Sequence, residues 1–195
     1  APAKDVAALR FGVYCDMLSS HEPLGFQTSF QADTLIDAVL ENVFATHCSN
    51  FIKRDYRRLW GNDETFFNGP GFEVPTAGVG RTMHREYHYD SDNIDNLDRY
   101  HLVESLWVLK RVTDVFESDF TPVRKYKGPL YQSRYGLYID PTRDKRGAEI
   151  LEAMQILMDG KRSLFDIARA LDADFFLLLD IAEKMLGLGL IEKAK

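Results

Sequence analysis

The chain has 195 residues, of which 45% are hydrophobic and 12% aromatic, enough for one medium domain or for one domain with a small module. Its formal net charge of −6 argues against a nonspecific nucleic-acid binder, because such proteins usually carry a basic excess. No apolar run approaches the ~20 residues that span a bilayer, and the first residues have no signal-peptide pattern. The composition therefore predicts a soluble, cytoplasmic protein with no membrane partner.

The first part of the chain has the alternation of strands and helices that is typical of an α/β domain. The apolar run 10–17 predicts a buried strand that ends near Asp16. Apolar residues at helical spacing predict a helix over 32–47, capped by Asp33 or Thr34. The following segments predict a turn-rich stretch over 61–71, a short buried strand over 74–80, a polar loop over 81–98 and an amphipathic helix over 100–116.

The composition changes near Pro141, and we expect a domain boundary between residues 140 and 141. Before it, segment 120–140 is aromatic and basic without periodicity, which predicts an extended segment with little regular structure. After it, helical patterns over 148–158, 164–171 and 175–186 precede a short strand near 190–193. Three short helices with a tight turn and a trailing strand predict a winged-helix module.

A winged helix is often a DNA-binding module, but the charges of its third helix oppose that function here. The pattern contains Asp174, Asp180 and Glu183 against the single Lys184. Phosphate contacts supply most nonspecific affinity for DNA, so this helix is a poor DNA reader. Its many apolar residues favour burial or a protein interface, and we expect packing or homo-oligomerisation in place of a nucleic-acid partner.

The two cysteines, Cys15 and Cys48, lie far apart without the spacing of a metal-binding or redox pair. This pattern predicts ordinary buried thiols in a reducing compartment.

Two carboxylate features of the first part could belong to a site. Asp16 ends the first predicted strand, and functional groups gather just past the carboxyl ends of strands in open α/β sheets. A lone Asp at that place is more commonly a turn or cap residue. Asp63 and Glu64 lie in a Gly-rich loop, where they could line a pocket or form a plain turn.

The loop 81–98 contains histidines, arginines and several carboxylates, and it follows the second predicted strand. It should therefore lie at the same sheet edge as Asp16. Imidazole nitrogen and carboxylate oxygen are both zinc ligands, and Asp90 or Asp92 could orient the imidazole of His88. Spacing alone still favours a solvated acidic loop with its histidines on the surface.

The three features, in this order, resemble the co-catalytic zinc aminopeptidases. Tyr14 to Leu18 (YCDML) is similar to a family pattern in which a metal-binding Asp ends a strand, and Asn62-Asp63 with 71–75 looks like the Asp loop that follows. The run from Glu86 to Asp95 resembles more closely a bacterial aminopeptidase-like branch that carries a C-terminal winged helix. Segment 159–167 (DGKRSLFDI) is similar to a motif of that module. The resemblance covers nearly the whole chain.

The resemblance implies a fold and a set of site residues. Residues 1–140 would form the C-terminal part of a three-layer αβα zinc-exopeptidase-like domain, and residues 141–195 a small α-rich winged-helix domain. Two zinc ions would be bound by the complete protein. The implied residues are Asp16 and His88 as metal ligands, Asp92 as the residue that orients a ligand, and Asp63, Arg81, His84 and Tyr87 as substrate-binding residues.

The implied activity is hydrolysis of an N-terminal residue, or of another amide beside a free amine, in a peptide or aminoacyl small molecule. The family's other ligands and its general base lie upstream of the Asp16 strand, but no histidine precedes Asp16 in this sequence. No catalytic residue is therefore assigned. We expect the chain to belong to a longer zinc metallopeptidase, to associate with the N-terminal remainder of that protein, and to be inactive alone. The alternatives are a non-catalytic interaction module that keeps the fold, and a winged-helix transcriptional regulator.

Overall fold

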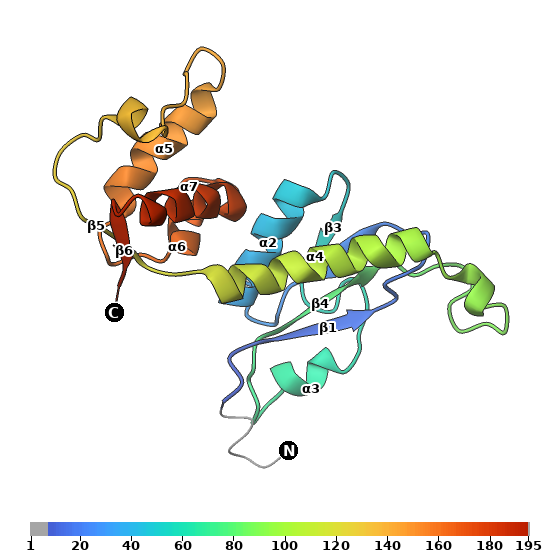
Figure 1. The fold of residues 1–195 in the computed structure, drawn as a ribbon. Coiled ribbons are helices and arrows are strands. Elements are labelled where there is room, and N and C mark those ends of the chain that lie inside the picture. The colour runs from blue at the N-terminus through green and yellow to red at the C-terminus, as the bar shows by residue number, and fades with distance from the viewer. Residues whose placement is uncertain (1–7, 195) are drawn as a thin grey trace. The chain divides into compact units, whose positions relative to one another are not determined.

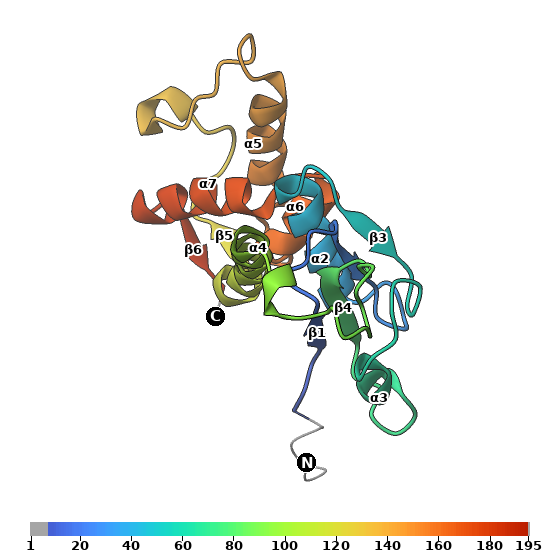
Figure 2. The same ribbon diagram turned by 90° about the vertical axis from the view of Figure 1, so that its right-hand side faces the viewer.

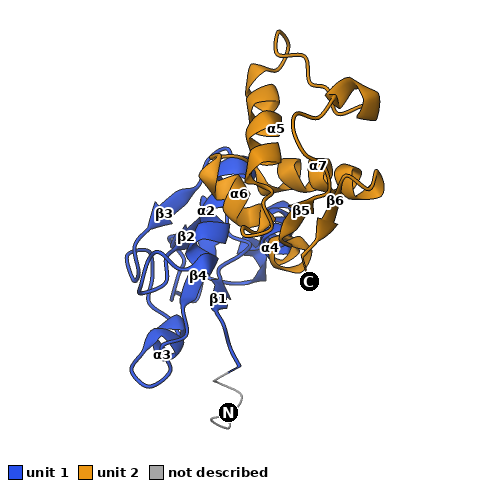
Figure 3. Cartoon of the chain, turned by 90° about the vertical axis from the view of Figure 1, so that its left-hand side faces the viewer, with its two compact units in different colours: residues 1–112 blue, residues 113–195 orange. Residues whose placement is uncertain are grey.

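The computed structural model describes residues 8–194 and has a mixed α/β architecture (Figure 1). It divides into two compact units, residues 1–112 and 113–195, which Figure 3 colours separately. The division falls within α4 (Arg99–Ser118), which confirms the helix predicted over 100–116.

A four-stranded sheet forms the centre of the first unit. Its strands are β1 (Gly12–Asp16), β2 (Leu24–Gln27), β3 (Ile52–Arg54) and β4 (Thr76–Arg81), in the spatial order β1-β4-β2-β3. β1 runs parallel to β4, whereas β2 is antiparallel to β4 and parallel to β3. The strands predicted over 10–17 and 74–80 are confirmed. The sequence does not predict β2 and β3, because strands of four and three residues are too short for a clear periodic pattern.

Two helices of the first unit, α2 (Leu35–His47) and α3 (Glu64–Asn68), lie on opposite sides of β4 in Figures 1 and 2. α2 confirms the predicted helix and begins after Thr34, which forms a capping box with Asp37. Its Phe44 packs against Phe26 of β2, with ring centroids 4.9 Å apart, and both rings are fully buried. The turn-rich segment 61–71 contains the short helix α3, which the glycines on both sides obscure in the sequence.

β1 lies at one edge of the described sheet, and this position corrects two predictions. The sequence predicts a buried strand, but most of its residues are half-buried and Cys15 is exposed. Among the described residues, no strand pairs with its outer side. The prediction of two buried thiols is thus wrong for Cys15, whereas Cys48 is half-buried, and both cysteines are free.

The second unit consists of three helices and a two-stranded ribbon. α5 (Lys145–Leu157), α6 (Leu164–Ala170), α7 (Phe175–Gly187) and β6 (Ile191–Lys193) confirm the three predicted helices and the short strand. β6 pairs in antiparallel fashion with β5 (Pro122–Arg124), inside a segment for which the sequence predicts little regular structure. This pairing joins segment 120–140 to the C-terminal helices. The compact units therefore divide near residue 112, whereas the sequence predicts a boundary at 140/141.

Two short 3-10 turns, η1 (Ile94–Asn96) and η2 (Gln132–Tyr135), complete the described elements. Within residues 8–194, no helix is both long enough and apolar enough to cross a membrane.

Candidate functional site

The parallel pairing of β1 with β4 creates the sheet edge at which the candidate site lies. Asp16, the last residue of β1, is in register with Gly80, so the segments that follow both strands leave from the same edge. A Cβ atom at Gly80 would lie 2.1 Å from the carbonyl oxygen of Asp16. Only glycine therefore allows the two backbones to approach this closely.

The Asp16 carboxylate is held by donors from two segments. Its Oδ1 accepts a hydrogen bond from the Met17 backbone N–H at 2.8 Å, and its Oδ2 accepts one from Asn62 Nδ2 at 3.1 Å. Met17 adopts a left-handed backbone with φ +49°, which turns the chain directly after the strand. The carboxylate is thus oriented at the sheet edge before any ligand binds.

The loop before α3 contains the two carboxylates that the sequence singles out, and they have different environments. Glu64 is fully buried and accepts hydrogen bonds from Gln27 Nε2 at 3.0 Å and from the Asn62 backbone N–H at 2.9 Å. These hydrogen bonds hold the loop in place, and the side chain of Asn62 extends from that loop to Asp16. Asp63, the neighbouring residue, is exposed and remains accessible to a ligand.

Tyr14 connects these groups electrostatically. Burial raises the pKa of its hydroxyl, and the negative charges of Asp16, Asp63 and Glu64, together with Tyr87, raise that pKa further. The carboxylates and the loop containing Tyr87 are therefore close enough to act on one hydroxyl. Sequence reasoning missed Tyr14, although a residue two positions before Asp16 in a strand lies on the same face.

The loop after β4 is shaped by a series of turns around His88. The Tyr87 N–H donates to the His84 carbonyl, and the Tyr89 N–H donates to the Glu86 carbonyl. His88 is exposed, adopts φ +67°, and stacks on Tyr87 with ring centroids 4.0 Å apart. This stacking gives the imidazole a defined orientation.

The carboxylate of Asp92 pairs with a different histidine from the one expected. Its Oδ1 lies 3.1 Å from His84 Nε2. The structure therefore shows a contact of Asp92 with His84, and the orienting role of Asp92 toward His88 stays a prediction. Spacing does not distinguish the two, because Asp92 follows His88 and His84 within the same compact loop.

Arg81, which the sequence predicts as a substrate-binding residue, is only 2% exposed, and its guanidinium is bonded to several groups of the protein. Its guanidinium donates to the carbonyl oxygens of Leu18 (3.2 Å), Glu22 (2.9 Å) and His101 (2.9 Å). It also pairs with Glu104 Oε2 at 2.5 Å. Arg81 therefore ties the loop after β1 to the first turns of α4.

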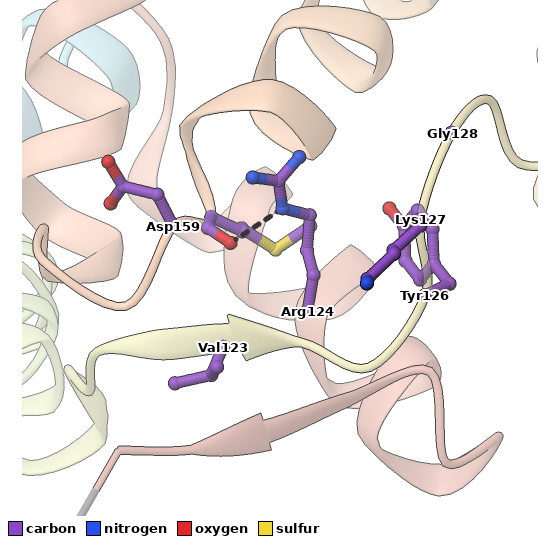
Figure 4. Close-up of a pocket in the computed structure, with 7 residues that line it drawn as sticks. Val123, Arg124, Tyr126, Lys127, Gly128 and Asp159 are labelled. Atoms are coloured by element: carbon purple, nitrogen blue, oxygen red, sulfur yellow. Dashed lines mark hydrogen bonds between the residues drawn. The ribbon is translucent and has the colours of Figure 1, made fainter.

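A separate pocket of about 330 Å³ lies in the second unit, near β5 and the end of α5 (Figure 4). Figure 4 shows the guanidinium of Arg124, whose Nε donates to the Met158 carbonyl at 3.0 Å. The residues that line this pocket are Val123, Arg124, Tyr126, Lys127, Gly128, Met158 and Asp159. None of the predicted site residues lines it.

A comparison with solved structures shows which known protein has the same fold. The crystal structure of a "putative peptidase" from Clostridium acetobutylicum matches with a TM-score of 0.81 and 21% sequence identity, so the chain shares the fold of that protein. The match covers 98% of this chain and 44% of the other, so this chain spans less than half of that protein's length. The chain belongs to the family described as "Domain of unknown function (DUF4910)", whose family profile matches residues 2–119. No curated protein matches the sequence.

Proposed function

We propose that this chain forms part of a zinc-dependent, aminopeptidase-like hydrolase that cleaves an N-terminal residue, or another amide beside a free amine. The observation that carries the proposal is the parallel pairing of β1 with β4, since it brings the Asp16 carboxylate and the His88 loop to one sheet edge. The matching fold of the Clostridium protein supports a peptidase-like role. The proposal includes the three-layer domain and the winged helix, which are supported by helices on both sides of β4 and by three helices joined to a β-ribbon.

The donor chemistry of this edge fits part of a zinc site. Asp16 offers a carboxylate oxygen that is already oriented by Met17 and Asn62, and His88 offers an imidazole nitrogen. Oxygen and imidazole nitrogen are both zinc ligands, but a catalytic zinc needs at least three protein ligands. The remaining ligands and the general base would come from other parts of the complete protein.

The outer side of β1 has no partner strand among the described residues, and we infer that the sheet continues there in the complete protein. Beside this strand lies a largely apolar pocket of about 240 Å³, lined by Leu9, Phe11, Gly12, Val13, Tyr14, Phe67, Val74 and Thr76. An apolar, half-buried strand edge invites pairing with a further strand. In the proposed protein, the N-terminal remainder covers this edge and completes the site.

The proposed residues of the edge bind metal, contact the substrate or orient another side chain. Asp16 and His88 hold metal, and the exposed carboxylate of Asp63 attracts the ammonium group of the substrate. Tyr87 and His84 border the substrate, and Asp92 orients His84. Zinc, when bound, lowers the pKa of a water molecule and polarises the scissile carbonyl. Peptides and aminoacyl small molecules are the substrate class that this arrangement suits.

The test is hydrolysis of an aminoacyl anilide and of its N-acetylated form by the protein at its native length. We expect cleavage of the free-amine substrate only. His88→Gln should lower kcat/KM by at least about tenfold, because the loss of a supporting residue at a metal site already costs that much. Asp95→Asn, an exposed change in the same loop, is the matched control and should leave kcat/KM unchanged.

The proposal fails if neither substrate is cleaved, or if the N-acetylated form is cleaved as fast as the free amine. The first outcome would favour a non-catalytic interaction protein that keeps the fold.

A further inference from the structure

A second group of metal-ligating side chains lies away from Asp16 and His88. Its members are His21 in the loop after β1, and Asp98 and His101 at the start of α4. One ligand atom of each residue lies within 4.8 Å of the other two. Among the residues that the structure describes, this is the group of three or more potential ligands that meets that distance.

The backbone around this group is held in place by several hydrogen bonds. The Asp98 N–H donates to the Ser19 carbonyl at 2.8 Å, and Ser105 Oγ donates to the Leu18 carbonyl at 2.7 Å. The buried guanidinium of Arg81 bonds the carbonyls of both Leu18 and His101. These hydrogen bonds therefore join the loop to the start of the helix, and the three side chains extend from these two segments.

The carboxylate of Asp98 lies between the two imidazoles. Its Oδ2 is 3.5 Å from His21 Nδ1, and its Oδ1 is 3.9 Å from His101 Nδ1. The two rings are nearly perpendicular, with centroids 5.4 Å apart. Ligand atoms around a tetrahedral zinc lie about 3.3 Å from one another, so small side-chain rotations would close the group on an ion.

One imidazole nitrogen of this group is buried without a hydrogen bond. His101 Nδ1 is shielded from solvent and has no hydrogen-bond partner, and 3.9 Å is too long for a hydrogen bond to Asp98. Buried polar atoms without a partner are uncommon and call for an explanation such as an ion.

We propose that His21, Asp98 and His101 form a binding site for one divalent transition-metal ion, with zinc as the expected ion. Two imidazole nitrogens and one carboxylate oxygen are a common zinc ligand set that leaves a fourth position open. A pocket of about 290 Å³ adjoins the group, and both histidines line it. Cys48 lines the same pocket, but it is not one of the three residues whose ligand atoms lie within 4.8 Å of one another.

The site shares no residue with the proposed Asp16 and His88 centre, so it does not depend on the proposed function. Its location next to the Arg81 network suggests that the bound ion joins the loop after β1 to α4. Metal binding at this place would stabilise the folded first unit by binding the native state alone.

The experiment titrates the chain of residues 1–195 with ZnCl₂ while the histidine imidazole resonances are followed by NMR, and with Co²⁺ while visible absorption is recorded. We expect zinc to shift the resonances of His21 and His101, and Co²⁺ to give the spectrum of a low-symmetry bound ion. His21→Gln, at a side chain that is 70% exposed, should weaken zinc binding at least about tenfold without unfolding the protein.

Asp95→Asn, an exposed change outside both proposed centres, is the control and should leave zinc binding unchanged, and His88→Gln should leave the zinc-induced shifts of His21 and His101 unchanged. The inference is overturned if zinc leaves both imidazole resonances unshifted, or if His21→Gln binds zinc as tightly as the parent. Loss of zinc binding in His88→Gln alone would assign the ion to the other centre and overturn the inference as well.

Discussion

The thiol of Cys48 shows how its surroundings set the chemistry of a single residue. Burial raises its pKa to about 11, the negative charge of Glu104 raises it as well, and Arg81 acts in the opposite direction. The thiolate is both the nucleophile and the metal ligand of cysteine. Cys48 is therefore expected to react slowly at neutral pH, although it lines a pocket.

The reactivity of Cys48 toward iodoacetamide should follow this pKa. Near pH 8 we expect alkylation about a hundredfold slower than for a fully exposed thiol with an ordinary pKa of 9.0, because the thiolate fraction is lower by about that factor. The rate should keep rising until the pH approaches 11. Peptide mapping by mass spectrometry at several pH values measures it, and a rate that stops rising near pH 9 would refute the assignment.

Single residues of the candidate site are predictable only where position and chemistry coincide. Asp16 ends a strand, and the loop that contains His88 follows the neighbouring strand, so topology alone predicts both at one edge. The burial of Arg81 is not predictable, because its partners are carbonyl groups of Leu18, Glu22 and His101, which any sequence offers. Hydrogen bonding to backbone atoms leaves no pattern in the side chains.

At the scale of elements, the contact between β1 and β4 determines the geometry of the site. Gly80 lies against the Asp16 backbone, and Gly25 lies similarly close to the Ile52 carbonyl in β3, where a Cβ atom would be 2.5 Å away. Both contacts are between backbones, which cannot move aside as a flexible side chain does. The glycines of β2 and β4 therefore serve the packing of the sheet.

Gly80→Ala should disturb β1 and the candidate site together. We expect a loss of about 1–3 kcal/mol in the free energy of unfolding, the usual cost of forcing an extra group into a packed site. Urea unfolding measures this loss. Gly187→Ala, at a position where a Cβ atom meets nothing within 4 Å, is the control and should be neutral or slightly stabilising. Equal effects of the two changes would contradict the close approach of β1 and β4.

The elements themselves are predictable in proportion to their length. α2 and α4 carry several turns of apolar periodicity, and β1 and β4 are continuous short runs, so the sequence indicates all four. β2, β3 and β5 have three or four residues each and depend on partners distant in sequence. Their formation is decided by tertiary pairing, which local propensity does not record.

At the scale of the whole molecule, the proposed function requires more residues than the candidate edge supplies. It spans 44% of the Clostridium protein that shares its fold, and the outer side of β1 has no partner strand among the described residues. The zinc ligands proposed at the candidate edge are one carboxylate and one imidazole, fewer than a catalytic zinc requires. The proposed activity therefore belongs to the complete protein.

The most direct test of this account is the zinc content of the protein at its native length, measured by mass spectrometry after removal of loosely bound metal. The measurement is best made in a His21→Gln background, so that the second proposed site does not contribute. We predict bound zinc in that parent, and a reduced zinc content in both Asp16→Asn and His88→Gln. If both variants retain as much zinc as the parent, Asp16 and His88 are not metal ligands and the proposed function is wrong.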